Sequence, residues 1–444
     1  MVKNDLNRRD FLKKSALAGA AIGLAGPYSI ARGNQSPNDQ VTVAIMGGRG
    51  RARALARSFA NVKGTVIKSI FDVDYRPLDE LAEDVRQRQG TKPVTGTDFR
   101  KALDDPDIDA LVIAAPDHWH TPATIMALKA GKHVYVEKPA SHNPAETELV
   151  VNAQRRYNKV VQMGNQQRSS KITQQAIAEI SDGIIGNPYY AKAFYANARS
   201  SIGHGKIASV PGWLDYELWQ GPAPRTPYRD NIIHYNWHWF WKWGTGEALN
   251  NGTHEYDIAR WALGVEHPNR ISSSGGRFHY DDDWEFYDVQ NVTFEFPDGK
   301  AINWEGRSAN GLPFYDRGRG TTIHGTKGSI LMDRNGYLVY DLDNNEVKRV
   351  MEADQVADPL DTVGGGGMTD LHAHNFARAI RQGEKLNSPI EEGQKSVLAL
   401  HLSNISQKIG RSLNINPRNG RIIGDSEAMS LWSRQYERGW EPTI

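Results

Sequence analysis

The sequence predicts an α/β protein of two domains, the first with a doubly wound parallel sheet and the second with hairpins of short strands. Three observations support this fold class. The chain has 444 residues, which is too long for one ordinary core. Strand-like segments alternate with helical ones over residues 41–164, a pattern typical of a parallel sheet. In the second half, apolar and polar residues alternate around tight turns, which indicates antiparallel pairing.

Composition excludes several kinds of partner and chemistry. The net charge is +1 with acidic and basic residues intermixed, so nothing indicates a nucleic acid or an anionic membrane as partner. Cysteine is absent, which rules out disulfides, thiol nucleophiles and cysteine-bound metals. The histidines His234, His238 and His254 match no compact zinc pattern, so no metal site is predicted.

The N-terminus has the features of an export signal. Paired Arg8 and Arg9 precede an apolar run of about fifteen residues, too short and too rich in glycine and alanine for a membrane span of about 20 residues. The segment resembles a twin-arginine export signal over residues 1–31, with cleavage near Ala31 and a polar linker over 32–40. We therefore expect a periplasmic protein, exported already folded. The alternative is the basic amphipathic start of a cytoplasmic helix.

A glycine-rich turn opens the first domain, which we predict over residues 41–164. The segment VTVAIMGGRGRARALARSF runs from a strand through Gly47, Gly48, Arg49 and Gly50 into a helix. Such a turn directs backbone N–H groups and the positive end of the helix at a pyrophosphate. The spacing is not a strict GxGxxG, because Arg49 stands where a second glycine often lies. We predict a Rossmann domain in which these four residues contact a dinucleotide.

An acidic residue ends the second predicted strand. Asp72 follows TVIKSIF, a little over twenty residues after the glycine turn, where a carboxylate can accept both ribose hydroxyls and repel a 2′-phosphate. This favours NAD over NADP, although the nearby Arg76 keeps NADP open as a less favoured cofactor. The alternative for Asp72 is an ordinary turn residue at a strand end.

Three further buried strands are predicted in the first domain, within DIDALVIAAPDHWHTP, GKHVYVEKP and KVVQMG. Ligands of a doubly wound sheet lie at the carboxyl ends of its strands. We therefore predict cofactor contacts from the residues that follow two of these strands, namely Pro116, His120, Glu137 and Lys138.

Five segments occur in a recognisable order: VAIMGGRGRA, AAPDHWHTP, VYVEKP, GNQQR and NNGTHEYDIARW. Together they resemble the glucose–fructose oxidoreductase / inositol dehydrogenase (Gfo/Idh/MocA) family, from about residue 40 to the end of the chain. The resemblance implies a Rossmann domain joined to an α+β domain with an open, mostly antiparallel sheet. It also implies a tightly held nicotinamide, a carbohydrate substrate, and a homodimer or homotetramer.

The second domain is predicted over residues 165–415. The segment 289–308 alternates apolar and polar residues around a PDGK turn, and 321–350 gives further short strands broken at KG, NG and DNN. Helices are expected over 369–383 and 392–410. Residues 416–444 are expected to form a C-terminal tail that packs on the body of the protein.

Two residues are candidates for catalysis. Oxidising an alcohol needs a base for the hydroxyl proton, which favours a histidine or a lysine tuned by burial. Lys138 follows a buried strand directly, and by resemblance His254 takes the place of the histidine that transfers the substrate proton. The alternatives are a surface lysine at a strand end and a core histidine with a structural hydrogen bond.

The stretch 244–264 is predicted to be helical, with Asn250, His254 and Asp257 on the face toward substrate. By resemblance, inositol dehydrogenase-like members carry an aspartate at the position of Asn250. An amide carries no charge, so it cannot raise the pKa of His254 as a carboxylate would, but it can hydrogen-bond a sugar hydroxyl. Asp257 is predicted to bind substrate, and roles in anchoring the helix or orienting the imidazole remain open.

Further substrate contacts are predicted from an aromatic segment and a junction. HYNWHWFWKW contains Trp237 and His238, and aromatic faces commonly hold sugar rings. A packed corner or a subunit contact is the alternative for this segment. Arg168 in GNQQRSS is expected at the junction of the two domains.

Three functions follow from these features. The first is an exported NAD-dependent oxidoreductase that transfers hydride between a sugar, glycoside or sugar-acid hydroxyl and a tightly bound nicotinamide. The second is an NAD-dependent glycoside hydrolase that oxidises C3 transiently, eliminates the aglycone and reduces the product again. The third is a sugar-binding protein without catalysis, which the presence of both Lys138 and His254 makes the weakest of the three.

Overall fold

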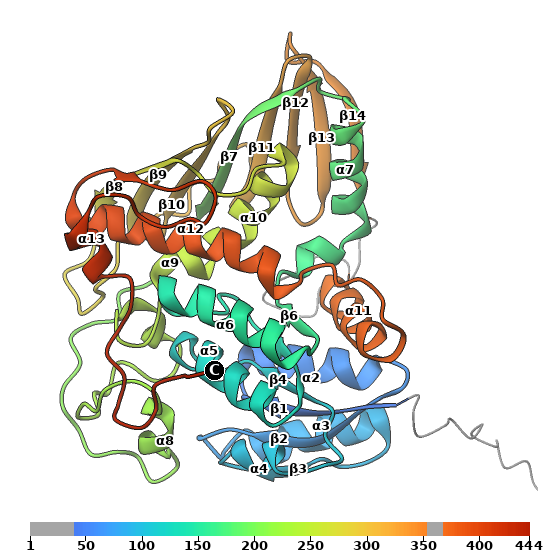
Figure 1. Ribbon diagram of the computed structural model, residues 1–444, viewed down its shortest axis with the longest axis vertical. Helices are drawn as coiled ribbons and strands as arrows, with labels where there is room; N and C mark the ends of the chain where they lie inside the picture. The colour runs from blue at the N-terminus through green and yellow to red at the C-terminus, as the bar shows by residue number, and fades with distance from the viewer. Residues whose placement is uncertain (1–39, 353–366) are drawn as a thin grey trace, which may run out of the picture. The chain divides into compact units, whose positions relative to one another are not determined.

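The computed structural model describes residues 40–352 and 367–444 (Figure 1). The predicted signal over 1–31, and all of the predicted linker except residue 40, lie outside the described residues. None of the described helices is long and apolar enough to cross a membrane.

Six parallel strands form the first sheet within the described residues, in the order β3-β2-β1-β4-β5-β6. This confirms the predicted doubly wound sheet. Its inner strands are apolar because helices cover both faces, whereas the short and partly exposed β3 gave no signal in the sequence. The strands are β1 Val41–Met46, β2 Thr65–Phe71, β3 Val94–Gly96, β4 Ala110–Ile113, β5 His133–Val136 and β6 Val161–Met163. The helices are α2 Gly50–Asn61, α3 Leu78–Gln89, α4 Arg100–Leu103, α5 Asp117–Lys129 and α6 Pro144–Tyr157.

The strand order reverses between β1 and β4, which is where a doubly wound sheet opens a crevice for its ligand. The carboxyl ends of all six strands lie at one edge because the strands are parallel. Gly47 therefore follows β1, Asp72 follows β2 and Glu137 follows β5 at the same edge.

The second sheet has nine strands in the described part of the chain, in the order β14-β13-β12-β11-β7-β10-β9-β8-β15. β7 and β10 pair in parallel and the other neighbours are antiparallel, so the predicted open, mostly antiparallel sheet is confirmed. The predicted hairpin is β9 with β10, joined at the PDGK turn. The strands are β7 Pro188–Ala196, β8 Arg270–Gly276, β9 Val289–Glu295, β10 Ala301–Arg307, β11 Arg319–Gly325, β12 Gly328–Met332, β13 Gly336–Asp341, β14 Glu346–Met351 and β15 Leu413–Asn414.

Two helices pack on the second sheet: α10 (Gly252–Leu263) lies against β7 and β11, and α12 (Ile390–Ile409) lies against β8 (Figure 1). Strands β9 and β10 alternate buried and partly exposed residues, as expected for a sheet covered mainly on one face. The shorter helices are η2 Gln166–Ser169, α7 Lys171–Ser181, α8 Tyr216–Gln220, η3 Asn236–Trp239, α9 Gly246–Asn250 and α13 Ser426–Ser430.

The stretch 244–264 is not one helix, contrary to the prediction. It divides into α9 and α10 at Asn251. Asparagine and glycine favour helix ends over helix interiors, and a side chain at Gly252 would crowd the Trp304 ring at 3.2 Å. Asn250 thus ends one helix while His254 lies in the first turns of the next.

C-terminal segments complete the packing around the first sheet. Helix α11 (Met368–Gln382) packs against α2, and Phe376 contacts the rings of Phe59 and Tyr135 edge-on at 6.0 and 5.9 Å between centroids. In the tail, the Trp440 ring lies 5.3 Å from that of Trp119. A helix that follows β14 of the second sheet in the chain therefore belongs to the core beneath the first sheet.

Candidate active site

A cavity of about 610 Å³ lies between the carboxyl ends of the first sheet and one end of the second. One wall consists of residues that follow strands β1, β2, β4 and β5 of the first sheet. The other wall comes from β7, β11, the start of α10 and the segment 197–245 between β7 and α9. We call 197–245 the crossing segment, because it forms part of the second wall and also contacts residues that follow β2.

The glycine turn leaves room for a dinucleotide. Gly47 has φ +123°, and a Cβ there would lie 2.7 Å from the carbonyl oxygen of Ala114. Helix α2 begins at Gly50 with no side-chain cap and no acidic residue in its first turn. Its first N–H groups therefore face the cavity without a competing anion, which fits a pyrophosphate.

Asp72 is held in place by the backbone beside the glycine turn. Its carboxylate accepts hydrogen bonds from the N–H groups of Gly48, at 2.6 Å, and Asp74, at 2.8 Å. Desolvation raises the pKa of Asp72 to about 6, so the group is mostly ionised at neutral pH. Its place at the end of β2 suits acceptance from the ribose hydroxyls of NAD.

The carboxylate of Asp74, two residues after Asp72, pairs with three side chains. Arg49, Arg76 and His234 approach its Oδ2 at 2.6, 2.8 and 2.9 Å. Burial acts to raise the pKa of Asp74, but hydrogen bonds from Arg76 and Arg49 hold it well below its usual range. Arg49 and Arg76 thus both pair with the carboxylate of Asp74.

The crossing segment is anchored to the first sheet at the same place. His234 reaches Asp74, and the guanidinium of Arg76 lies 3.4 Å from the centroid of the Trp213 ring. The N–H of Asp215 donates to the carbonyl oxygen of Val73 at 2.9 Å. The segment therefore spans the side of the cavity on which Asp72 lies.

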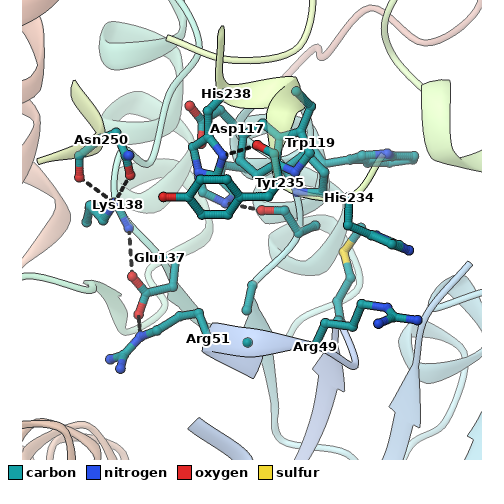
Figure 2. A pocket seen from close by; sticks show the side chains of 18 of the residues that line it. Arg49, Arg51, Asp117, Trp119, Glu137, Lys138, His234, Tyr235, His238 and Asn250 are labelled. Carbon is teal, nitrogen blue, oxygen red and sulfur yellow. Dashed lines mark hydrogen bonds and ion pairs between the residues drawn. The ribbon is translucent and has the colours of Figure 1, made fainter. Parts of the chain in front are cut away.

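Lys138 extends from the end of β5 toward the other wall (Figure 2). Its Nζ donates to the backbone carbonyl of Asn250 at 2.6 Å and to its Oδ1 at 3.1 Å. Desolvation lowers the pKa of Lys138, although Glu137 and Asp117 act to raise it. Asn250 thus contacts Lys138. Because its amide is neutral, it does not raise the pKa of Lys138 as a carboxylate at this position would.

His254 lines the same cavity and is 4% exposed. Its ring makes no hydrogen bond to any other described residue, so both nitrogens are available to a ligand. Burial, and next the cations Arg334 and Lys138, lower the pKa of His254 well below its usual value. The imidazole is therefore neutral at pH 7 and can accept or relay a proton.

Glu137 and His120 line the cavity and also brace the loop that carries Lys138. Glu137 accepts from Arg51 Nε at 2.8 Å, and Arg51 holds its pKa low against the effect of burial. The ring nitrogens of His120 contact the carbonyl oxygens of Pro139, at 2.5 Å, and Ala115, at 2.8 Å.

Aromatic side chains of the crossing segment cover the cavity. Trp237 and His238 stack with their centroids 3.6 Å apart, and the hydroxyl of Tyr235 accepts from Arg199 at 2.7 Å. Figure 2 shows Tyr235 and His238 to the right of Lys138 in that view. Of the predicted substrate-binding residues, Trp237, His238 and Asn250 line the cavity.

Two predicted substrate-binding residues lie outside the cavity lining. Arg168 and Asp257 form a buried ion pair with each other, with Arg168 Nη2 3.0 Å from Asp257 Oδ1. Asp257 also accepts a hydrogen bond from Ser396 at 2.6 Å. Burial acts to raise the pKa of Asp257, but the Arg168 guanidinium holds this pKa below its ordinary value. The polar face predicted for α10 is thus divided: His254 faces the cavity, and Asp257 anchors the helix.

All the predicted cofactor residues line the cavity: Gly47, Gly48, Arg49, Gly50, Asp72, Pro116, His120, Glu137 and Lys138. Sequence reasoning missed several lining residues: Arg51, Asp117, Tyr195, Asn197, Arg199, Tyr235, Asn251, Arg319 and Arg334. Arg51 could have been found from its place in the glycine turn. The arginines Arg199, Arg319 and Arg334 lie near strand ends but belong to no sequence motif.

No group of three or more metal-ligating side chains lies together in residues 40–352 and 367–444.

Comparison with known families assigns this arrangement. Residues 13–165 match the oxidoreductase family with an NAD-binding Rossmann fold, and residues 191–442 match the C-terminal alpha/beta domain of that oxidoreductase family. The chain belongs to the Gfo/Idh/MocA oxidoreductase family. The resemblance found in the sequence is thereby confirmed, as is NAD as the cofactor of the Rossmann domain.

Relatives of this Gfo/Idh/MocA member differ in their named activities. A "Glycosyl hydrolase family 109 protein" of Saccharopolyspora erythraea is 28% identical over 212 residues, which cover 43% of this chain and 46% of the relative. The match thus spans less than half of that relative's length.

Solved structures share the fold. Aldose-aldose oxidoreductase of Caulobacter crescentus, complexed with glycerol, has a TM-score of 0.65 at 18% identity, covering 85% of this chain and 100% of that chain. Levoglucosan dehydrogenase, complexed with NADH and levoglucosan, has a TM-score of 0.64 at 20% identity, covering 84% and 99%.

Proposed function

We propose that this Gfo/Idh/MocA member is an NAD-dependent oxidoreductase that transfers hydride between a carbohydrate hydroxyl and a tightly bound nicotinamide. One observation carries the proposal: Lys138, which follows β5, and His254, in helix α10, line one cavity with the glycine turn. The solved relatives named above act on, or were crystallised with, sugars and polyols, which supports a carbohydrate substrate.

The residues divide the chemistry between them. When bound, NAD would supply the acceptor or the donor of the hydride. Lys138 Nζ, kept at a lowered pKa, exchanges the proton of the reacting hydroxyl and stabilises negative charge on that oxygen. His254, neutral and without a protein partner among the described residues, accepts or relays the same proton. Asn250 positions the ammonium group.

Tight retention of the cofactor is part of the proposal. The crossing segment is tied to the first sheet through Asp74 and the backbone of Val73, beside Asp72, which supports retention of NAD. We also propose that the protein works in the periplasm, which rests on Arg8 and Arg9 and the apolar run after them. A retained cofactor fits a compartment in which free NAD is scarce when a second substrate, with a carbonyl group, takes the hydride back from the reduced cofactor on the enzyme.

Hydrolysis assisted by transient oxidation is a second candidate. The curated relatives named Glycosyl hydrolase family 109 proteins favour it, at 25–32% identity over parts of the chain. In that reaction the same Lys138 and His254 would serve a cycle of oxidation, elimination and re-reduction, with no net change in the cofactor.

A panel experiment separates these functions. The purified protein is first denatured, and the released nicotinamide is measured. The intact protein is then offered sugars, sugar acids and aryl glycosides, with absorbance at 340 nm and aglycone release followed together. Absorbance gained without aglycone release supports the oxidoreductase, whereas aglycone release without lasting absorbance supports the hydrolase. A protein that carries no nicotinamide and gives neither signal contradicts both.

A further inference from the structure

Three arginines line the far wall of the cavity, opposite the glycine turn. Arg199 follows β7, Arg319 begins β11 and Arg334 follows β12. Tyr195 of β7 pairs with Arg319, and Thr321 of β11 pairs with Met332 of β12. These three strand ends therefore lie side by side at the same end of the second sheet.

Two of the guanidinium groups are fixed by carboxylates behind them. Glu247 accepts from Arg199 Nε at 2.7 Å, and Glu255 accepts from Arg319 Nε at 2.6 Å. Both carboxylates are at most 5% exposed and neither lines the cavity. Each arginine is thus held from the protein side while part of it faces the cavity.

The two walls differ in the charged residues that line them. The cofactor wall carries both signs: the carboxyl groups of Asp72, Asp117 and Glu137 line it together with the cations Arg49, Arg51 and Lys138. Among the described residues from 195 onward, the lining contains three arginines and no Asp or Glu. Cations on this wall also help to hold the pKa of His254 low.

The remaining polar groups of the wall are neutral. Tyr195, Asn197, Tyr235 and Asn251 line it, and their hydroxyl and amide groups suit the hydroxyls of a sugar ring. Guanidinium groups pair with planar or tetrahedral oxyanions through two N–H donors at once, which a neutral hydroxyl cannot match.

We propose that the substrate of this site is an anionic sugar, whose carboxylate or sulfate group lies against Arg319 and Arg334 while a ring hydroxyl meets Lys138 and His254. This inference rests on the proposed oxidoreductase function, because it concerns the same cavity.

Matched pairs of ligands test the inference. Calorimetry on the NAD-loaded protein compares D-galacturonate with D-galactose and D-glucuronate with D-glucose, and D-galactose 6-sulfate tests the sulfate source. We expect the anionic member of at least one pair to bind at least about tenfold more tightly. The Arg334→Gln variant should lose most of that preference. Arg307→Gln is the control, because Arg307 is the last residue of β10 at the same end of the sheet but does not line the cavity.

If Arg334→Gln does not fold, binding of the acid and of the neutral sugar to the wild-type protein at increasing salt concentration provides a second test. Raising the ionic strength should weaken binding of the acid and leave the neutral sugar nearly unchanged. Neutral sugars that bind as tightly as their acids overturn the inference, and so does a preference for acids that survives in Arg334→Gln.

The same measurements keep the two proposals apart. If neutral sugars reduce the bound NAD and the acids do not bind, the anionic substrate is wrong and the oxidoreductase stands. If the acids bind with the expected preference but no ligand changes absorbance at 340 nm, the oxidoreductase is wrong and the anion site stands. If neither class binds, the anionic substrate is wrong, and the nicotinamide content with the wider panel decides the oxidoreductase.

Discussion

The two walls of the cavity are built from different parts of the protein. The cofactor wall is mainly backbone: a glycine turn, the start of α2 and a carboxylate held by two N–H groups. The wall of the second sheet is made of long side chains, with Arg199 and Arg319 each fixed by a buried carboxylate. A site built from backbone suits the cofactor, which is the same in every reaction. A site built from side chains can be altered by substitution to suit another substrate. Cofactor binding and substrate choice should therefore fail separately when mutated.

Replacing Lys138 should have the largest effect, because this residue links the two walls. In Lys138→Met, we expect turnover to fall by about 10²–10⁴-fold, since the group that exchanges the proton is gone. NAD should stay bound, because the glycine turn and Asp72 are untouched. The measurement is kcat together with nicotinamide content.

Lys129→Met is the control for that variant, because this exposed lysine ends α5 and does not line the cavity. Turnover at the wild-type rate in Lys138→Met would remove Lys138 from the chemistry.

Closing the glycine turn should break the cofactor wall alone. In Gly47→Ala, the new Cβ meets the carbonyl oxygen of Ala114 at 2.7 Å and the backbone must keep φ +123°. We expect NAD affinity to fall about a hundredfold, equivalent to about 3 kcal/mol. Gly131→Ala also has positive φ but has open space around it, so it should lose some stability and keep its NAD. Equal nicotinamide content in both variants would contradict the assigned turn.

Changing Asp72 should weaken the cofactor wall in a pH-dependent way. Because the folded pKa of Asp72 is about 6, the carboxylate loses its charge as the pH falls through 6, and NAD affinity should fall with it. Asp72→Asn should bind NAD about tenfold more weakly at pH 8 and show little pH dependence near 6.

Stability gives a second readout for the same variant. A folded pKa above the ordinary value means that the ionised carboxylate destabilises the cofactor-free fold above pH 6. Asp72→Asn should therefore raise the melting temperature of the cofactor-free protein at pH 8 and leave it nearly unchanged at pH 4. A lower melting temperature at pH 8 would show that the carboxylate holds the turn together.

The smallest effect is expected where the two walls touch. Asn250→Asp places a carboxylate against Lys138 Nζ and should raise the pKa of Lys138 by about one unit or more. The pH at which activity rises should move upward by the same amount. Asn250→Gln stays neutral and should leave that pH unchanged. An unshifted profile in Asn250→Asp would place the controlling proton on another group.

The contrast between the walls also explains what could be predicted. Gly47, Asp72 and Lys138 each lie next to a strand end within a short motif, so their position in the cavity followed from strand and turn patterns. Arg199, Arg319 and Arg334 meet only through the pairing of β7, β11 and β12, which no local pattern encodes.

Helical spacing misled at one place. It put Asn250, His254 and Asp257 on one face, but the helix breaks at Asn251, and Asp257 pairs with Arg168 through tertiary packing. Local periodicity gives the elements, and contacts between distant segments decide which of their polar groups face the ligand.

The central claim is that Lys138, after β5, and His254, in α10, converge on one substrate hydroxyl beside the nicotinamide. A crystal structure of the protein with NAD and a bound sugar acid tests it most directly. We predict Lys138 Nζ and a ring nitrogen of His254 each within about 3 Å of the same substrate oxygen. A sugar whose nearest hydroxyl contacts neither side chain, or contacts them through different oxygens far from the nicotinamide, would contradict the claim.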